Sequence, residues 1–249
     1  MDYPEYFARF YDIIYNSMRS EVDTDFYLKK ISETSGRVLE IGVGTGRFFA
    51  AALKKGADIY GIDISKSMIN ILLKKIDLEY HGRVSMQNAV DFRFPFRFNM
   101  ILAPFRVFSH LLTVQEQLSA LNNIYDHLEE GGHLIFDLYV PDPALTASGM
   151  SNYTDFSGEY EPGKKFSRTV DMKADIVNQI SNITMTFRWD EDEVARTESW
   201  NFKFRFYFRY ELEHLIERSK LALDNIYGNF NGGELTEGSK EFIVVCCRL

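Results

Sequence analysis

Residues 37–48 read Arg37-Val38-Leu39-Glu40-Ile41-Gly42-Val43-Gly44-Thr45-Gly46-Arg47-Phe48, and this stretch decides the fold. Its first half is a short, mostly apolar run that is typical of a buried strand. The glycines that follow allow a sharp backbone turn and let a ligand approach the main chain closely. A helix that starts after the turn offers free N–H groups at its first residues. The stretch therefore predicts a strand, a ligand-binding turn and a helix.

Short apolar runs and helical patterns continue to alternate beyond this stretch. Strands are predicted over residues 38–41, 59–62, 84–87, 100–103, 133–138, 223–230 and 242–248. Helices are predicted over residues 47–55, 66–76, 114–128 and 211–219, with Ser65 as the N-cap of the second. This alternation with short links favours an α/β, Rossmann-like fold, in which helices cover both faces of a mostly parallel seven-stranded sheet.

The pattern changes between residues 147 and 210. Segments 169–174, 176–189 and 196–209 alternate apolar and polar residues, and Phe202, Phe204, Phe206 and Phe208 recur at every second position. This period indicates an inserted antiparallel β subdomain, with the four phenylalanines on one face. We therefore predict a helical N-terminal cap over 1–35, a core over 36–146 and 211–249, and an insertion over 147–210 that acts as a candidate substrate lid.

Composition limits the classes of partner. The chain has 249 residues, 45% of them hydrophobic, which is enough for a substantial core. The net charge of −8 argues against a nucleic-acid partner, which would need a basic surface. The adjacent Cys246 and Cys247 predict no disulfide, and no metal-ligand spacing is found. Without a signal peptide or a long apolar run, the expectation is a cytoplasmic protein that does not span a membrane, either a monomer or a homodimer.

The residues around the glycine turn indicate the kind of ligand. Asp63 ends the next predicted strand, where its carboxylate can accept hydrogen bonds from a ribose diol. The glycines are spaced G-x-G-x-G, whereas nicotinamide-binding turns use G-x-G-x-x-G. Glu40 is unfavourable beside a pyrophosphate and suits a cationic ligand group. Both observations argue against a nicotinamide-dependent oxidoreductase.

With its neighbouring segments, the stretch resembles motif I of the class I S-adenosylmethionine-dependent methyltransferases. Residues 60–65 resemble the second motif of that family, 85–92 its adenine-contacting segment, 99–105 its fourth-strand motif, and 128–136 the loop and strand written L-x-P-G-G. Weaker similarity at residues 210–213 and 227–230 resembles small-molecule methyltransferases with a β-rich insertion between strands five and six.

The resemblance implies S-adenosylmethionine as cofactor, S-adenosylhomocysteine as product and no metal. It implies that three glycines contact the methionine part and the ribose, and that Glu40 faces the amino end. The other implied contacts are Asp63 with the ribose hydroxyls, Ile64 and Met68 with the adenine faces, Asn88 and Ala89 with the adenine edge, and Pro104 in the fourth-strand motif; the glycines are Gly42, Gly44 and Gly46. Two residues depart from the family pattern, Asn88 at a frequent Asp and Glu130 at a frequent Pro.

Candidate acceptor-site residues follow the fourth and fifth strands: Phe105, Arg106, His110, Asp137 and Tyr139. Tyr11 joins them because related enzymes use a Tyr-Asp pair near the site. Among these, His110, Arg106 and Tyr11 are the candidate catalytic residues. His110 suits a general base because its reference pKa is about 6.5, and Arg106 suits an anionic acceptor group. A structural His110 and a surface Arg106 are the alternatives, since alignment alone can sustain methyl transfer.

We therefore predict methyl transfer from S-adenosylmethionine to an N or O atom of a small-molecule acceptor. The alternatives are a non-catalytic S-adenosylmethionine-binding protein and a methyltransferase that acts on a protein or on RNA. Adenine-amino methyltransferases usually carry N/D-P-P-Y/F after the fourth strand. This chain has Ala103-Pro104-Phe105-Arg106 there, which argues against that group.

Overall fold

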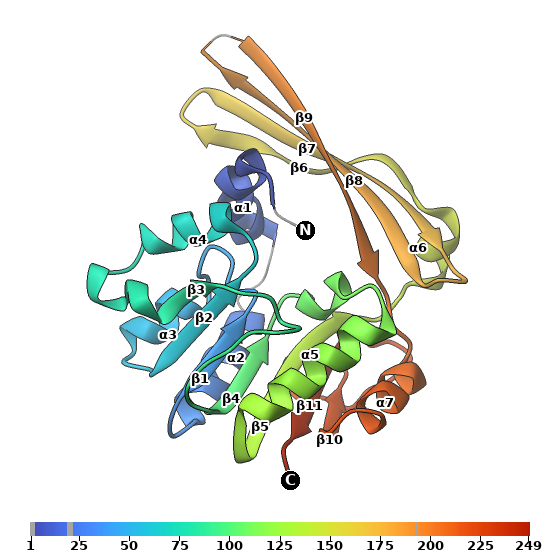
Figure 1. The fold of residues 1–249 in the computed structure, drawn as a ribbon. Helices are drawn as coiled ribbons and strands as arrows, with labels where there is room; N and C mark the ends of the chain where they lie inside the picture. Colours follow the sequence, from blue (N-terminus) through green and yellow to red (C-terminus); the bar gives the residue numbers. More distant parts are fainter. Residues whose placement is uncertain (1–2, 19–21, 193) are drawn as a thin grey trace.

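The computed structural model describes residues 3–18, 22–192 and 194–249 (Figure 1). The helices in this part are α1 (Glu5–Met18), α2 (Val22–Glu33), α3 (Phe49–Lys54), α4 (Lys66–Leu73), α5 (Val114–His127), α6 (Pro143–Ser148) and α7 (Arg209–Glu217), with 3-10 helices η1 (Leu78–Arg83) and η2 (Val107–His110). The strands are β1 (Val38–Ile41), β2 (Ile59–Asp63), β3 (Val84–Met86), β4 (Phe98–Ala103), β5 (Leu128–Tyr139), β6 (Met150–Glu161), β7 (Lys164–Asp175), β8 (Ile180–Glu191), β9 (Val194–Arg205), β10 (Ala222–Tyr227) and β11 (Glu241–Cys247). Among the described residues, no helix is both long and apolar enough to cross a membrane.

The larger sheet has seven strands in the order β10-β11-β5-β4-β1-β2-β3. The pairs β1–β2, β1–β4, β2–β3 and β4–β5 are parallel. β11 runs antiparallel to both of its neighbours, β5 and β10. The predicted mostly parallel, Rossmann-like sheet is therefore confirmed, and its antiparallel part lies at one edge.

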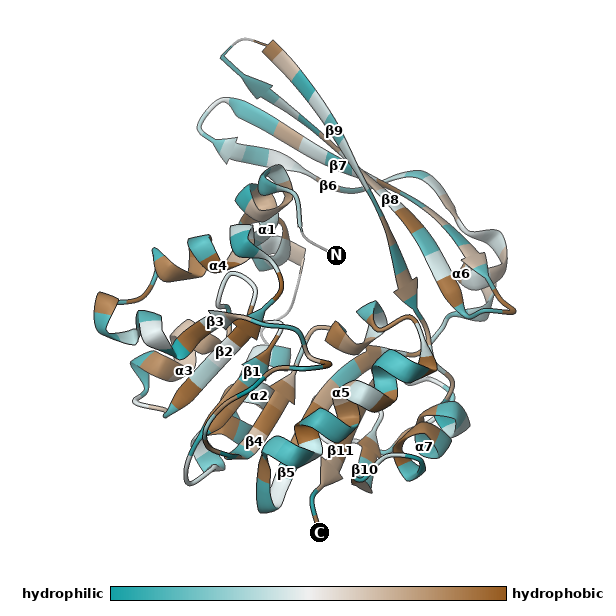
Figure 2. Ribbon diagram, viewed as in Figure 1, coloured by the Kyte–Doolittle hydropathy of each residue, from teal (hydrophilic) through white to brown (hydrophobic). Residues whose placement is uncertain are grey.

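Helices cover both faces of this sheet. In β4, Ile101 packs in a cluster with α5 and α7, and the next residue, Leu102, packs in a cluster with α2 and α3. Successive strand residues point to opposite faces, so a strand buried on both sides needs apolar residues in sequence. Figure 2 shows this as hydrophobic central strands beneath helices that are hydrophilic on their outer sides.

Side-chain caps fix the start of two core helices. Ser65 accepts a hydrogen bond from the Met68 backbone N–H, as predicted for the N-cap of α4. Thr113 and Glu116 form a reciprocal capping box at the start of α5. The chain passes directly from the end of α5 into β5, which begins at Leu128. β5 therefore starts earlier than the predicted strand over 133–138.

The insertion is a four-stranded antiparallel sheet in the order β6-β7-β8-β9 (Figure 1). The sequence pattern predicted only the last three strands, because edge strand β6 is mostly exposed and has few apolar residues. The prediction that four phenylalanines share one face is wrong. Phe202 and Phe204 lie in β9, but that strand ends at Arg205, so Phe206 is buried beyond it and Phe208 is 53% exposed.

The two N-terminal helices pack against different parts of the molecule. α1 contributes Phe7 and Phe10 to an aromatic cluster with Phe166, Phe187 and Trp200 of the insertion. α2 contributes Tyr27 and Ile31 to the core beneath the larger sheet. α1 is also tied to the glycine turn and to the segment after α4. The contacts are made by Asp12, which accepts from Thr45 Oγ1 and from Lys75 Nζ, both at 2.6 Å.

Candidate active site

The loops that follow β1, β2 and β4 carry most of the predicted site residues. β1 lies between β2 and β4 in the sheet, so the chain leaves β1 in one direction and later returns on its other side. In open α/β sheets, ligands bind at the carboxyl ends of the strands at such a reversal. The topology therefore brings the glycine turn, Asp63 and the segment after Ala103 to one edge.

The three glycines of the turn all have left-handed backbone angles, with φ of 72° at Gly42, 53° at Gly44 and 85° at Gly46. A Cβ atom on Gly42 would lie 2.4 Å from Val107, and one on Gly46 would lie 2.1 Å from Leu72. For a Cβ on Gly44, the nearest atom in the described part of the chain, apart from its two neighbours in sequence, would be the Gly42 carbonyl oxygen, at 3.9 Å. The protein's own packing thus excludes side chains at Gly42 and Gly46, whereas Gly44 faces open space that a ligand can occupy.

Asp63 joins the end of β2 to the glycine turn. Its carboxylate is 6% exposed and accepts hydrogen bonds from the N–H groups of Gly44 and Ser65, both at 2.8 Å. A carboxylate has about four acceptor positions. A carboxylate can accept hydrogen bonds from ribose hydroxyls, so Asp63 suits the role predicted for it.

Glu40 is a buried carboxyl group beside the turn. It accepts a hydrogen bond from the Phe49 backbone, but its Oε2 atom is buried without a hydrogen-bond partner in the described part of the chain. Burial raises the pKa of Glu40 well above its ordinary value, and the negative charge of Asp63 raises it further. A cationic group at Oε2 would supply the missing partner and favour the ionised form. Glu40 therefore fits the amino end of the predicted cofactor.

We expect Glu40→Gln to remove a pH dependence of folding stability. The pKa of Glu40 is raised in the folded state, so its protonated carboxyl group stabilises the fold. This stabilisation is complete below about pH 4.5 and is lost as the pH rises through the raised pKa. At pH 8, we expect the variant without ligand to be more stable than the wild type by about 1–3 kcal/mol. Urea unfolding from pH 5 to 8 measures this free energy, with the exposed Glu130→Gln as the control. If the free energy of unfolding changes with pH in the same way in Glu40→Gln and wild type, the prediction is contradicted.

The four positions assigned to the adenine ring lie in different environments. The Met68 side chain is 1% exposed and packs in the cluster that contains α1. Ile64 is half-buried after β2. Asn88 is exposed, and its side-chain oxygen accepts from the Val90 N–H at 3.2 Å. The Ala89 carbonyl accepts from a side-chain amide of α5 at 3.4 Å. Met68 is therefore part of the α1 interface, and the Asn88 oxygen is engaged within its own turn.

A strained turn follows Pro104 at the end of β4. Phe105 and Arg106 have φ of 61° and 65°, which are rarely adopted by non-glycine residues and carry a conformational cost. Asp137 of β5 lies beneath the turn and is fully buried. Its Oδ1 atom accepts from the Phe105 N–H at 2.6 Å and from the Tyr27 hydroxyl at 2.7 Å. Asp137 therefore holds the turn in place and is not among the residues that line the large cavity described below.

A narrow hollow of about 30 Å³ lies beside Glu40. Its lining includes Tyr15 and six of the predicted site residues, which are Tyr11, Glu40, Gly42, Gly44, Pro104 and Phe105. This volume holds about two water molecules at most. Entry of a larger ligand therefore requires some of the residues that line the hollow to move apart.

A larger cavity of about 750 Å³ lies between α1, the segment after β4 and the insertion. The three predicted catalytic residues, Tyr11, Arg106 and His110, all line it. Its volume is in the range of small-molecule sites, about 300–1,000 Å³. Tyr11, Tyr15 and Phe105 line both this cavity and the narrow hollow, so the two spaces meet at these three rings.

Arg106 is held by one residue of β5 and one of β11. Its Nη2 atom donates to Glu241 Oε1 at 3.1 Å, and its guanidinium lies 5.2 Å from the centre of the Tyr139 ring. Its Nε atom is buried without a hydrogen-bond partner among the described residues. Because Glu241 already balances the charge, an anionic acceptor group gains less from Arg106 than from an unpaired arginine.

His110 is packed among aromatic side chains. Its Nε2 atom lies 3.0 Å from the Tyr3 hydroxyl, and its ring centre lies 4.9 Å from that of Phe204. Burial lowers the pKa of His110 to about 4. The side chain is therefore neutral at pH 7, but its pKa lies far from the value that suits a general base at that pH. The interpretation from the ordinary histidine pKa thus overstated its basicity.

The cavity also contains residues that sequence reasoning missed, including Tyr15, Glu241 and Trp200. Tyr15 follows Tyr11 by four residues, a spacing that places both on one face of a helix. That spacing could have identified Tyr15 from the sequence. Glu241 and Trp200 reach the site only through the fold, so no local pattern could have found them.

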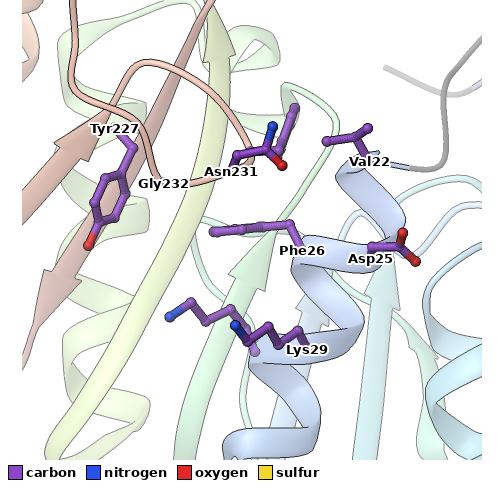
Figure 3. Close-up of a pocket in the computed structure, with 9 residues that line it drawn as sticks. Val22, Asp25, Phe26, Lys29, Tyr227, Asn231 and Gly232 are labelled. Carbon is purple, nitrogen blue, oxygen red and sulfur yellow. The ribbon is translucent and has the colours of Figure 1, made fainter.

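A separate hollow of about 430 Å³ lies between α2 and the loop after β10 (Figure 3). Phe26 and Lys29 of α2 face Tyr227 and Asn231 across it. None of the predicted site residues lines this hollow. Over residues 3–18, 22–192 and 194–249, no group of three or more His, Cys, Asp or Glu side chains is arranged to hold a metal ion.

Comparison with known proteins agrees with this geometry. Residues 38–132 match a family described as a methyltransferase domain. A protein of Geobacillus sp. (strain WCH70) that carries a methyltransferase name is 26% identical over 140 residues. That alignment covers 54% of this chain and 57% of the relative, so the chain spans little more than half of that protein.

Two solved structures share the fold over nearly the whole chain. An S-adenosylmethionine-dependent methyltransferase from Clostridium acetobutylicum ATCC 824 has a TM-score of 0.77 and 15% identity, with 98% of each chain covered. An amino pentose methyltransferase from Micromonospora echinaspora, solved with S-adenosylmethionine bound, has a TM-score of 0.71 and 16% identity, with 100% of this chain and 98% of that chain covered. The domain match therefore covers residues 38–132, and the two solved structures show that the fold of the whole chain is shared with S-adenosylmethionine-dependent methyltransferases.

Proposed function

We propose that the protein binds S-adenosylmethionine at the glycine turn and transfers its methyl group to a nitrogen atom of a small molecule held in the large cavity. One observation carries this proposal: Tyr11, Tyr15 and Phe105 line both the hollow beside Glu40 and the 750 Å³ cavity. A donor bound on one side of these rings would meet an acceptor bound on the other side.

The residues at the turn suit the cofactor chemically. Glu40 would hold the amino group of the cofactor, and Asp63 would hold its ribose hydroxyls. The open space at Gly44 would admit the part of the cofactor that contacts the protein backbone. When bound, S-adenosylmethionine supplies an electrophilic methyl group on a sulfonium whose leaving group departs neutral. The chain then needs to align the acceptor and exclude water, and alignment alone can supply up to about 7–11 kcal/mol of the barrier.

The cavity lining favours an amine as the acceptor. Its charged groups are the carboxylates of Asp23, Asp142 and Glu241 and the guanidinium of Arg106. Glu241 pairs with Arg106, and Asp23 pairs with Arg47 at 2.6 Å. Among the described lining residues the excess negative charge is therefore that of Asp142, which attracts an ammonium group. The structural neighbour named as an amino pentose methyltransferase supports the same choice. His110, with its lowered pKa, would contact the acceptor as a neutral group. The bound ammonium group must release a proton to solvent before its nitrogen lone pair can attack the methyl group.

Asp63→Ala tests the cofactor site. We expect S-adenosylmethionine binding to weaken by about 1–3 kcal/mol, because the ribose hydroxyls lose their acceptor. Calorimetry of binding measures this. Asp58→Ala is a matched control, because Asp58 immediately precedes the other end of β2 and pairs with Arg83 at 2.7 Å. Equal affinity in wild type and Asp63→Ala, with the fold intact, would remove Asp63 from the site.

An acceptor screen tests the transfer itself. Purified protein with S-adenosylmethionine is offered amino sugars, other primary and secondary amines, and the corresponding alcohols, and S-adenosylhomocysteine is quantified. We expect product with an amine and none with the matched alcohol. Product only with alcohols would overturn the choice of nitrogen. Cofactor binding without turnover on any acceptor would instead favour a non-catalytic S-adenosylmethionine-binding protein.

A further inference from the structure

Arg168 is a charged side chain buried in the insertion sheet. It lies in β7 and is 1% exposed. Its guanidinium forms a bidentate pair with Asp155 of β6, through Nε to Oδ1 at 3.0 Å and Nη2 to Oδ2 at 2.6 Å. A buried ion pair adds little net stability, because desolvation offsets the attraction. The pair therefore calls for an explanation other than stability.

The third side of the guanidinium points to α1. Nη1 donates to the Tyr15 hydroxyl at 3.2 Å, and the guanidinium carbon lies 5.2 Å from the centre of the Tyr15 ring. Nη2 also lies 3.8 Å from the sulfur of Met18, one helical turn further along α1. Arg168 therefore fixes the position of one tyrosine of α1 from outside that helix.

Tyr15 stands where the two spaces of the site meet. Its ring centre lies 4.5 Å from that of Tyr11 and 5.0 Å from that of Phe105, and all three rings line both spaces. Because Arg168 donates to the phenol oxygen, the hydroxyl proton must point toward a different acceptor. The orientation of Tyr15 at the junction thus depends on a residue of the insertion.

We propose that Arg168 is a positioning residue for methyl transfer, which fixes the Tyr15 ring and hydroxyl at the point where the sulfonium methyl meets the acceptor. This inference rests on the proposed function. It assigns the insertion sheet a role in the geometry of the reaction itself. Asp155 takes part by holding the guanidinium in the orientation that reaches Tyr15.

The test uses two ligands that differ only at this junction. S-adenosylmethionine carries the methyl group and the positive charge there, and S-adenosylhomocysteine has neither. Calorimetry gives the ratio of their dissociation constants for wild type, Tyr15→Phe, Arg168→Met, Arg168→Lys and the double variant Tyr15→Phe/Arg168→Met. Arg188→Met is the matched control, because Arg188 lies on the next strand, is exposed, and donates to Thr169.

We expect Tyr15→Phe and Arg168→Met each to change the ratio by about three- to tenfold, the size of one hydrogen bond. The double variant should change it no further than either single variant, because Arg168 acts through Tyr15. Arg168→Lys should recover part of the wild-type ratio, and it also serves if Arg168→Met does not fold. Arg188→Met should leave the ratio unchanged.

Two failures are distinguishable. If the wild type binds neither ligand, the proposed function is wrong and this inference falls with it. If the wild type binds both ligands but the Tyr15 and Arg168 variants leave the ratio unchanged, the positioning role alone is overturned. Multiplicative effects in the double variant would also overturn it, since they would show that Arg168 acts independently of Tyr15.

Discussion

Gly44→Ala should weaken S-adenosylmethionine binding by at least about 100-fold while the protein remains folded. The φ of 53° at this position costs an alanine about 1–2 kcal/mol, which most domains tolerate. The added methyl group would project into the space beside the turn, where, among the described residues other than its chain neighbours, the nearest atom is the Gly42 carbonyl oxygen at 3.9 Å. If the cofactor lies against the backbone there, the methyl group occupies its place. Calorimetry gives the affinity, and urea unfolding gives the stability.

The chain offers a closely matched control in Gly56→Ala. Gly56 also has a left-handed φ, of 82°, and lies after α3, away from the turn. A Cβ atom there would meet no atom of the described residues within 4 Å, apart from its neighbours in sequence. The two variants should therefore lose similar stability, and only Gly44→Ala should lose binding. Equal affinity in the two variants would show that the space at Gly44 is not part of the ligand site.

The core fold could be predicted from the sequence because its signals are local. A strand buried on both faces is a continuous apolar run. The runs of β1, β2 and β4 are followed by Gly42, by the N-cap Ser65 and by Pro104, which mark where they end. The glycine turn and Asp63 could be predicted for the same reason. The local backbone conformation restricts which residue types can occupy each of these positions.

The insertion and the acceptor side of the site were harder to predict because they depend on distant contacts. β6 is a polar edge strand, so its sequence shows little of the apolar–polar alternation that would predict a strand. Arg168 carries no local pattern, and its role follows only from the approach of α1 to β7. The low basicity of His110 likewise follows from the burial that the fold creates, and the isolated side chain would titrate near its ordinary pKa.

Asp137→Ala should reduce the free energy of unfolding by about 3–5 kcal/mol, the largest stability effect expected at the site. The substitution removes the carboxylate oxygen that accepts from the Phe105 N–H at 2.6 Å and from the Tyr27 hydroxyl at 2.7 Å, in a fully buried position. It also releases two consecutive residues with positive φ, whose strain Asp137 helps to offset. Urea unfolding followed by circular dichroism measures the change.

Two companion variants separate the causes of this loss. Tyr27→Phe removes only the hydroxyl bond, so it should cost about 0.5–1.5 kcal/mol. Asp142→Ala removes an exposed carboxylate that accepts from the Leu145 N–H at the start of α6, and should cost about 1 kcal/mol. If Asp137→Ala costs no more than these two, the carboxylate does not hold the turn. A larger loss would mean that the geometry of Phe105, and with it the junction between the two spaces, depends on a buried group that contacts neither space.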